Sequence, residues 1–295
     1  MLRPPPLRPG DRVAVVSPSS PVDRALLERG LTRLAERYRL TLDAHVFEAD
    51  RYLAGPDTLR AAALQAALTD PETRAVFCAR GGSGAGRLLP LLEVAVFPPK
   101  QLVGCSDATV LHAALQAHGR TSIHGPVVTQ LAEQPQHVLD LLFLLLEGGM
   151  PPPLSGAVPL VEGIAEGPLL GGNLSVLTTV LGTSWLPDTR GAILLLEDDG
   201  EQPYRLDRLW THLRNAGLLA GLAGLALGDF TQCERPGADF TARDVLRSLA
   251  EETRLPCAVG FPVGHGPVNV PLSLGTRVRL DAGAGTLTPL EVATQ

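Results

Sequence analysis

Hydrophobic and polar positions in the first half of the chain follow two alternating patterns. Short apolar runs, such as residues 12–16 and 75–79, end at turns rich in glycine, serine or proline, as buried strands do. Between these runs apolar residues recur at helical spacing, as Leu27, Leu31 and Leu34 do. Strands that alternate with helices predict a mostly parallel sheet covered on both faces, and therefore an α/β fold.

Further elements of this half are expected from local patterns. Residues 40–47 end in β-branched and aromatic side chains and predict a strand. Residues 57–70 are rich in alanine and predict a helix, with Asp57 as its candidate N-cap. Because ligands of open parallel sheets bind beyond the carboxyl ends of the strands, the turns after residues 75–79 and 101–104 are expected at one rim.

The pattern changes between residues 149 and 168, where proline and glycine dominate and helical periodicity stops. Beyond this stretch we expect a strand ending at Glu197, amphipathic helices with a stop at Gly217 and a start near Thr241, and a C-terminal antiparallel hairpin. The predicted organisation is an N-terminal parallel-sheet domain, a crossover linker and a smaller C-terminal α+β or barrel-like domain. These parts span residues 1–148, 149–168 and 169–295.

Composition narrows the class of protein. With 295 residues, 45% of them hydrophobic, the chain can bury two cores, and its net charge of −6 argues against nucleic-acid binding. It lacks an apolar run of the length of a membrane span, and prolines stand where a signal peptide would be apolar, so we expect a soluble, cytoplasmic protein. The four cysteines form no C-x-x-C pair, which predicts neither a disulfide framework nor a zinc site.

A serine stands at an abrupt strand-to-helix turn in the stretch "GCSDA". The apolar run at residues 101–104 leads into Ser106, and a helical pattern follows at once. Such a turn presents a hydroxyl clear of the backbone and directs amide N–H groups toward a developing oxyanion, although Ala108 replaces the second glycine of the usual nucleophile elbow. The alternative is that Ser106 or Asp107 caps the helix.

The glycine-rich turn "ARGGSGAGR" at residues 79–87 is a second candidate site. Gly81 and Gly86 have the spacing of a phosphate loop, but Arg87 and Leu88 stand where lysine and serine or threonine are needed. A nest of backbone N–H groups for an anion or oxyanion therefore fits better than a nucleotide site. A purely structural turn is the alternative.

A serine nucleophile needs a base and an acid that orients it. His265 lies between two glycines in an expected loop, and His124 lies in another; a lone loop histidine is commonly structural. Glu197 ends an apolar strand, where it could hold an imidazole or simply meet solvent. Four other histidines fall within helical patterns and are expected to pack or face solvent: His112, His118, His137 and His212.

Several segments in this order resemble the serine L,D-carboxypeptidases of bacterial peptidoglycan recycling, peptidase family S66. They include "VAVVSPSSPV", "ARGGSGAGRLLPLL", "GCSDATVLHAAL", "SIHGPVV", "GPLLGGNLSVL", "LLLEDDGEQPYRLDRLWTHLRNAG" and "FPVGHGPVNVPLSLG". The resemblance implies a triad with Ser106 as nucleophile, Glu197 as acid and His265 as base. It also implies an oxyanion hole formed by the backbone N–H groups of Gly82 and Asp107.

The pocket walls depart from that pattern. Ser83 stands where the family often has an aromatic residue, and Cys105 where it often has tyrosine or phenylalanine. Because side chains alternate at a strand end, Cys105 is expected to point away from the substrate. A carboxypeptidase must bind a free carboxylate, and Arg80 and the turn around Ser83 are the nearest candidates for that contact.

The resemblance implies hydrolysis of the bond between the L-centre of a diamino acid and the terminal D-alanine of a muropeptide. It implies a homodimer that needs no metal or organic cofactor. One alternative resembles the microcin C immunity peptidases, which cleave aminoacyl-sulfamoyl-adenylates and need an aromatic clamp, for which only Trp185 and Trp210 are available. The other alternative is a non-enzymatic peptide- or sugar-binding member of the scaffold.

Overall fold

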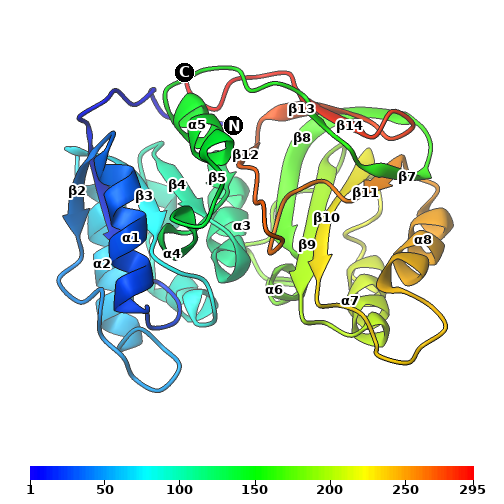
Figure 1. Cartoon of the computed structure of the whole chain (residues 1–295), viewed down its shortest axis with the longest axis horizontal. Helices are drawn as coiled ribbons and strands as arrows, with labels where there is room; N and C mark the ends of the chain where they lie inside the picture. Colours follow the sequence, from blue (N-terminus) through cyan, green and yellow to red (C-terminus); the bar gives the residue numbers. More distant parts are fainter.

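Two β-sheets lie side by side in the computed structural model, which describes all 295 residues (Figure 1). The first sheet has six strands in the order β12-β5-β4-β3-β1-β2. Its five N-terminal strands are parallel, as predicted, and β12 (Leu272–Leu274) joins them antiparallel to β5. The five are β1 (Arg12–Val16), β2 (Arg39–Leu42), β3 (Thr73–Cys78), β4 (Gln101–Gly104) and β5 (Ser122–His124).

Helices cover both faces of this sheet, so alternate side chains of β1 enter two different cores. Val13 and Val15 pack in the core beneath α1, α4 and α5. Ala14 and Val16 belong to the core formed with α2 and α3. The helices are α1 (Arg24–Ala35), α2 (Asp57–Thr69), α3 (Thr109–Ala117), α4 (Val128–Leu131) and α5 (Gln136–Leu146), with 3₁₀ turns at Ala85–Leu91, Val94–Val96 and Ser106–Ala108.

The strand expected over residues 40–47 is shorter than predicted and ends at Leu42. The chain turns at this point, because the N–H of Val46 donates to the carbonyl of Asp43 at 3.1 Å. The apolar residues Val46 and Phe47 pack against the core of the sheet without extending β2. Burial, and not strand formation, accounts for their hydrophobic character.

Asp57 is the first residue of α2 and not its N-cap, which is Pro56. The Asp57 carboxylate forms ion pairs with Arg60 and with Arg87, the latter at 2.7 Å. An acidic side chain in the first turn also interacts favourably with the helix dipole. The position is therefore suited to an acid although no capping bond is made.

The second sheet has eight strands in the order β6-β14-β13-β8-β9-β10-β11-β7 and curls into a half-barrel (Figure 1). Its four central strands are parallel and its outer strands antiparallel. The parallel strands are β8 (Ile164–Asn173), β9 (Ile193–Asp199), β10 (Gly224–Thr231) and β11 (Cys257–Val259). The others are β6 (Leu154–Ser155), β7 (Val158–Val161), β13 (Arg277–Asp281) and β14 (Thr286–Pro289).

Several expectations for this half are confirmed. The C-terminal hairpin is β13 and β14, the helix α7 (Pro203–Asn215) is followed by Gly217 with φ 80°, and Thr241 caps α8 (Ala242–Thr253). A short helix, α6 (Leu174–Thr178), follows β8. The stretch expected as a crossover, residues 149–168, carries β6, β7 and the start of β8.

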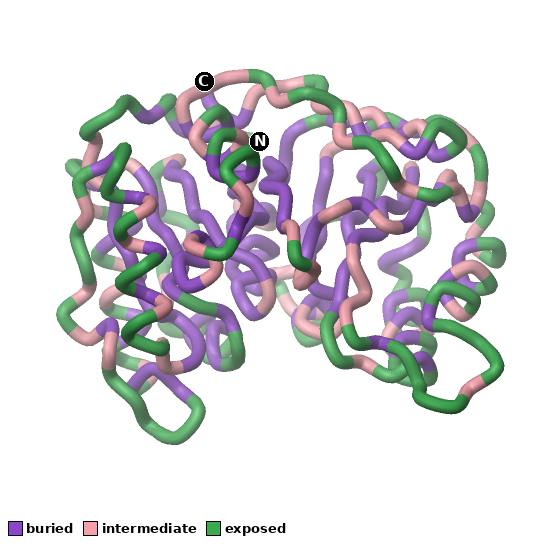
Figure 2. Tube along the Cα trace, in the orientation of Figure 1, coloured by how far each residue is buried: buried purple, intermediate pink, exposed green.

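The two sheets share one continuous apolar core of 45 buried residues. The helix α3, which follows the turn at Ser106, contacts β8 and α6. Leu111 of α3 belongs to the same core as Leu174 and Leu177 of α6. Figure 2 shows the buried chain where the two sheets meet. The N-terminal domain and the C-terminal sheet are therefore packed together at the place where α3 begins.

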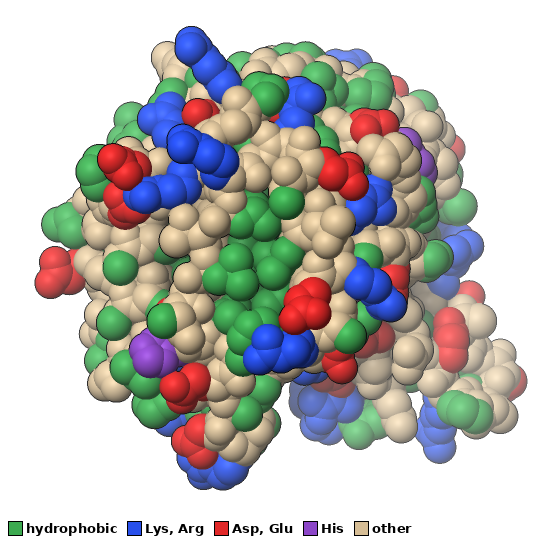
Figure 3. All heavy atoms as spheres, turned by 60° about the vertical axis from the view of Figure 1, so that its left-hand side comes forward, with side chains coloured by type: hydrophobic (Ala, Val, Ile, Leu, Met, Phe, Trp, Pro, Cys, Tyr) green, Lys and Arg blue, Asp and Glu red, His purple; other side chains and the backbone are tan.

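The surface carries charges of both signs. Figure 3 shows a face of the molecule on which basic and acidic side chains are interspersed around an apolar area. A hollow of about 390 Å³ beside β1, β2 and α2 is lined mainly by apolar residues, including Leu42, Ala63 and Ala66. None of the helices combines the length and the apolar character that a membrane crossing requires.

Candidate active site

A pocket of about 280 Å³ lies where the two sheets meet, at the carboxyl ends of β3 and β4. The N-terminal domain lines it with Gly82, Cys105 and Ser106, and the C-terminal half contributes Asp199 and His265. Only two of its ten lining residues are hydrophobic, so the pocket is suited to a polar ligand. The two turns expected at one rim of the sheet do meet there, as ligand sites of open parallel sheets do.

Ser106 occupies a strained backbone position between β4 and α3. Its φ is 60°, in the left-handed region where a non-glycine residue costs about 1 to 3 kcal/mol. A Cβ on Gly81 would lie 2.8 Å from Ser106 Cβ, so glycine is required opposite the serine. A Cβ on Gly104 would lie 3.0 Å from Ala108 Cβ, which explains why small residues flank this turn. The chain thus accepts strain and tight packing to expose one hydroxyl.

The capping alternative for this turn is not what the structure shows. Cys105 precedes the 3₁₀ turn and Ala108 precedes α3, and no side-chain capping bond is made at either start. Asp107 Oδ2 instead accepts from the N–H of Ala85 at 2.7 Å. The carboxylate therefore ties the serine turn to the glycine-rich turn beside it.

The glycine-rich turn is held close to the serine by a second contact. Ser20 Oγ accepts from the N–H of Ser83 at 3.1 Å. Gly82 has φ 109°, and a Cβ there would lie 2.3 Å from Ser20 Oγ, so this position also requires glycine. Ser83 is exposed at the outer side of the turn, whereas Arg80 lines the pocket and donates to the carbonyl of Pro21 at 2.8 Å.

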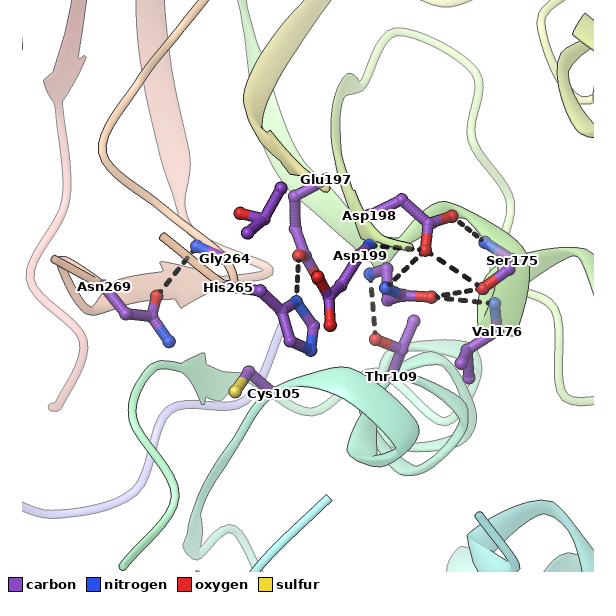
Figure 4. Close-up of polar contacts among 12 residues, drawn as sticks. Cys105, Thr109, Ser175, Val176, Glu197, Asp198, Asp199, Gly264, His265 and Asn269 are labelled. Atoms are coloured by element: carbon purple, nitrogen blue, oxygen red, sulfur yellow. Dashed lines mark hydrogen bonds and ion pairs between the residues drawn. The ribbon is translucent and has the colours of Figure 1, made fainter. Parts of the chain in front are cut away.

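A carboxylate and an imidazole form a close pair on the opposite side of the pocket (Figure 4). Glu197, near the end of β9, is fully buried, and its Oε2 lies 2.6 Å from His265 Nδ1. A Cβ on Gly264 would lie 2.5 Å from Glu197 Oε2, so the preceding glycine is what lets the histidine loop approach. When Nδ1–H donates to the carboxylate, Nε2 of the neutral ring is left as an acceptor on a side chain that lines the pocket.

The pair is electrostatically matched. Burial alone would raise the pKa of the Glu197 carboxyl, but the neighbouring His124 and His265 outweigh it and hold that pKa below its usual range. Burial would likewise lower the pKa of His265, but Glu197 outweighs it, with smaller contributions from Asp199 and Asp198, and the pKa is raised. An ionised carboxylate next to an imidazole of increased basicity is the arrangement expected of a general base.

The loop that carries His265 is anchored to the other domain. Asn269 Oδ1 accepts from the N–H of Gly264 at 3.0 Å, and Gln134 Oε1 accepts from the N–H of Asn269 at 2.9 Å. Gln134 lies between α4 and α5 of the N-terminal domain. Sequence reasoning missed both amide residues: Asn269 lies within the quoted segment "FPVGHGPVNVPLSLG", but no spacing marks it as a contact of the loop, and Gln134 lies in no motif.

Asp198 is a second group that sequence reasoning missed. It is buried and accepts from Asn173 Nδ2, from the N–H and hydroxyl of Ser175 and from the N–H of Asp199, at 2.9 to 3.2 Å. The N–H of Asn173 donates to Thr109 Oγ1 at 3.0 Å (Figure 4). Burial raises the pKa of Asp198 to about 6. This network connects the start of α3, three residues after Ser106, with the end of β9.

The remaining candidates lie at the edge of the site. Cys105 lines the pocket, which strand alternation did not predict, but its Sγ lies 3.6 Å from Gln130 Oε1 and burial raises the pKa of the thiol. A buried, protonated thiol is a poor nucleophile. His124 is fully buried behind Glu197 and does not line the pocket, with Nε2 3.8 Å from Glu197 Oε1.

Comparison with known proteins gives the same family for both halves of the chain. The LD-carboxypeptidase N-terminal domain matches residues 13–125, and the LD-carboxypeptidase C-terminal domain matches residues 166–280. A Synechocystis protein provisionally named a carboxypeptidase is 40% identical over 291 residues, which cover 97% of this chain and 96% of that protein. The murein tetrapeptide carboxypeptidase of Pseudomonas aeruginosa is 35% identical over 279 residues, covering 88% of this chain and 89% of its own.

Solved structures agree with the fold. The muramoyltetrapeptide carboxypeptidase from Oxalobacter formigenes matches with a TM-score of 0.83 and 29% identity, covering 94% of this chain and 97% of that chain. The microcin C7 self immunity protein MccF shares the fold, with a TM-score of 0.90 at 22% identity over the whole of both chains. The two matching domain families and the full-length relatives lead to one conclusion: this chain belongs to the LD-carboxypeptidase family, peptidase family S66.

Proposed function

We propose that the protein is a serine L,D-carboxypeptidase that removes the terminal D-alanine from a murein-type tetrapeptide. The observation that carries the proposal is the pocket itself. The strained Ser106 from one domain and His265 from the other line the same 280 Å³ space, and Glu197 is buried behind His265 with Oε2 2.6 Å from its Nδ1. Two relatives whose names refer to murein tetrapeptides support this substrate class.

In the proposed mechanism, His265 Nε2 takes the proton of Ser106 as the hydroxyl oxygen attacks the carbonyl of the scissile amide. Glu197 stabilises the imidazolium that forms, and the imidazolium then protonates the leaving amine of D-alanine. Water, activated by the same imidazole, hydrolyses the acyl-enzyme and restores the serine. His265 carries each proton in turn: the proton of Ser106 leaves on the amine of D-alanine, and a proton of the attacking water replaces it on Ser106.

The oxyanion that develops on the scissile carbonyl needs fixed donors. We assign them to the backbone N–H groups of Gly82 and Asp107. The Gly82 N–H donates no backbone hydrogen bond within the protein, so it is free to bind an oxyanion. Contacts from Ser20 and from the Asp107 carboxylate brace the turn that carries it. The terminal carboxylate of the substrate is assigned to Arg80, the one cationic side chain among the pocket residues.

A sulfamoyl-adenylate substrate is the second candidate, and the pocket lacks what it requires. Trp210 is fully buried in the core, and Trp185 packs against that core from its edge. Neither tryptophan lines the pocket, and no other aromatic side chain does. An adenine ring would therefore find no stacking partner at the site.

Mass spectrometry of products from a defined mixture of muropeptides tests the proposal. We expect tetrapeptides to lose one D-alanine and pentapeptides that end in D-alanyl-D-alanine to remain intact, because the scissile bond must follow an L-centre. The Ser106→Ala variant is the matched control and should release nothing. Cleavage of the D-alanyl-D-alanine bond or of an internal bond would contradict the assignment.

A further inference from the structure

The catalytic carboxylate has two oxygens, and only one of them contacts His265. Glu197 Oε2 lies 2.6 Å from His265 Nδ1, whereas Oε1 is buried and has no hydrogen-bond partner in the protein. Buried carboxylate oxygens normally accept hydrogen bonds, because an ionised group without partners is costly to bury. The second oxygen therefore calls for a donor.

His124 is the group that faces this oxygen. Its Nε2 lies 3.8 Å from Glu197 Oε1, its side chain is fully buried, and neither ring nitrogen has a hydrogen-bond partner. It is the last residue of β5, where it pairs with Gly104 of β4 and Leu272 of β12. The approach thus joins the first sheet to β9 of the second.

The neighbouring His112 cannot be the partner of His124. The rings lie 6.4 Å apart, and both nitrogens of His112 are already engaged. Nε2 donates to the carbonyl of Gly104 at 2.9 Å, and Nδ1 lies 2.8 Å from Ser122 Oγ. Burial lowers the pKa of His112 to about 3, so that ring stays neutral. This leaves Glu197 as the polar group toward which His124 is directed.

We propose that His124 is a positioning residue for Glu197, whose Nε2–H is directed at Oε1 and holds the carboxylate with Oε2 against His265. The separation of 3.8 Å exceeds hydrogen-bond range, and a relative shift of about 1 Å brings the two atoms within it. Because the donor and the acceptor belong to different sheets, the contact ties the orientation of the acid to the packing of the two halves.

The catalytic consequence of this contact rests on the proposed function. Without a donor at Oε1, the carboxylate is free to rotate and more of its charge acts on His265. The acid limb of the pH profile, in which the rate rises as His265 loses its proton, then moves to higher pH, and kcat falls. KM stays the same, because His124 does not line the pocket. The other titratable groups near the pair are Asp198, Asp199, Asp229 and Cys105, and the variants below leave them unchanged.

Two amide substitutions separate positioning from packing. In His124→Gln the amide nitrogen can occupy the place of Nε2, whereas in His124→Asn it reaches only the place of Nδ1. We expect His124→Gln to keep most of kcat, and His124→Asn to lose about 10-fold or more, as when a supporting partner of a catalytic ligand is removed. KM should be unchanged in both variants, and the acid limb should move upward only in His124→Asn.

The buried neighbour provides the structural control. His112→Asn reaches only the place of Nδ1 beside Ser122 and loses the Nε2 hydrogen bond to Gly104 in the same region, so it should lower the melting temperature without moving the acid limb. Equal losses of kcat in His124→Gln and His124→Asn, with an unmoved acid limb in both, would show that His124 only fills space.

A spectroscopic measurement tests the placement independently of any substrate. In protein with ¹⁵N-labelled histidine, we expect a slowly exchanging Nε2 proton on His124 whose resonance shifts in Glu197→Gln, while that of His112 does not. A His124 ring without a proton on Nε2, or one insensitive to Glu197→Gln, would overturn the proposal. If the wild-type enzyme cleaved no muropeptide, the proposed function would fall, and this resonance would still decide the placement of His124.

Discussion

The N-terminal side of the pocket is built from chain neighbours, whereas the C-terminal side is assembled from residues far apart in the sequence. Gly82, Cys105 and Ser106 lie in two turns that follow adjacent parallel strands. Glu197 and His265 are separated by 68 positions and meet only because a glycine lets the loop approach β9. The first side presents its group through local strain, and the second through a buried hydrogen bond.

In the proposed mechanism the two sides have different tasks: the first supplies the nucleophile and the oxyanion donors, and the second supplies the base. Besides the shared core, two sets of hydrogen bonds connect them near the pocket. Thr109 and Asn173 link the start of α3 to the network of Asp198, and Gln134 holds the loop of His265 through Asn269. Changes on either side should therefore fail in distinguishable ways.

Substitution of the nucleophile should have the largest effect. Ser106→Ala should lower kcat by about 10⁶-fold, because no covalent intermediate can form, and the fold should be retained. Cys105→Ala, one residue away, should remain active, since a buried thiol does not attack. Steady-state hydrolysis of a murein tetrapeptide measures both. An active Ser106→Ala variant together with an inactive Cys105→Ala variant would show that Cys105, and not Ser106, is the nucleophile.

The next effect concerns the C-terminal side as a unit. Glu197→Ala should lower kcat by about 10⁴-fold, and His265→Ala should lower it by at least as much. Some activity should remain in both variants, because the oxyanion donors are still present. The double variant should lose far less than the product of the two, since the residues act together. The three kcat values are the measurement. Losses that multiply would mean that Glu197 and His265 do not act as a pair.

The pH dependence should reveal how the carboxylate changes the imidazole. His265 must be unprotonated to accept the serine proton, so kcat/KM should rise with pH along the acid limb of the profile. Because Glu197 raises the pKa of His265, the midpoint of that rise should lie above about 6.5. In Glu197→Gln the raising influence is lost while burial remains, so the residual activity should have its midpoint at lower pH. The kcat/KM profiles of the two proteins test this. An unmoved acid limb in Glu197→Gln would place the titration on another group.

The smallest effect should come from the pocket edge. Arg80 is exposed, and we assign it to the terminal carboxylate of the substrate. Arg80→Gln should lower kcat/KM by about 10-fold, as the loss of one charge-assisted hydrogen bond does. With the wild type, amidation of the C-terminus of the tetrapeptide should lower kcat/KM by a similar factor. With Arg80→Gln, the same amidation should lower kcat/KM little further. Equal rates on acid and amide would contradict a carboxypeptidase.

Local patterns were sufficient for most of the first domain. The apolar runs of β1, β3 and β4 and the helices between them could be predicted, because each pattern is contained within a few residues. Ser106 could be singled out because its strained turn demands small neighbours, and those are visible in the sequence. The strand expected over residues 40–47 failed because Val46 and Phe47 are buried without extending β2.

Contacts between distant segments could not be predicted in this way. Nothing in Leu272–Leu274 indicates that this strand joins the first sheet beside β5, since the pairing depends on the path of the whole second half. His124, expected in a loop at a strand end, is the last residue of β5, and its burial behind Glu197 could not be predicted because it depends on the packing of the two sheets. The triad itself was inferred from a resemblance, because its members share no local pattern.

The central claim is that the Glu197–His265 pair activates Ser106 across the pocket, and reaction with a fluorophosphonate tests it most directly. Peptide mapping of the labelled protein should locate a single phosphonyl group on Ser106, and the labelling rate should fall steeply in His265→Ala and in Glu197→Ala. Labelling of another residue would contradict the account. So would a Ser106 labelling rate that is the same in wild type and His265→Ala.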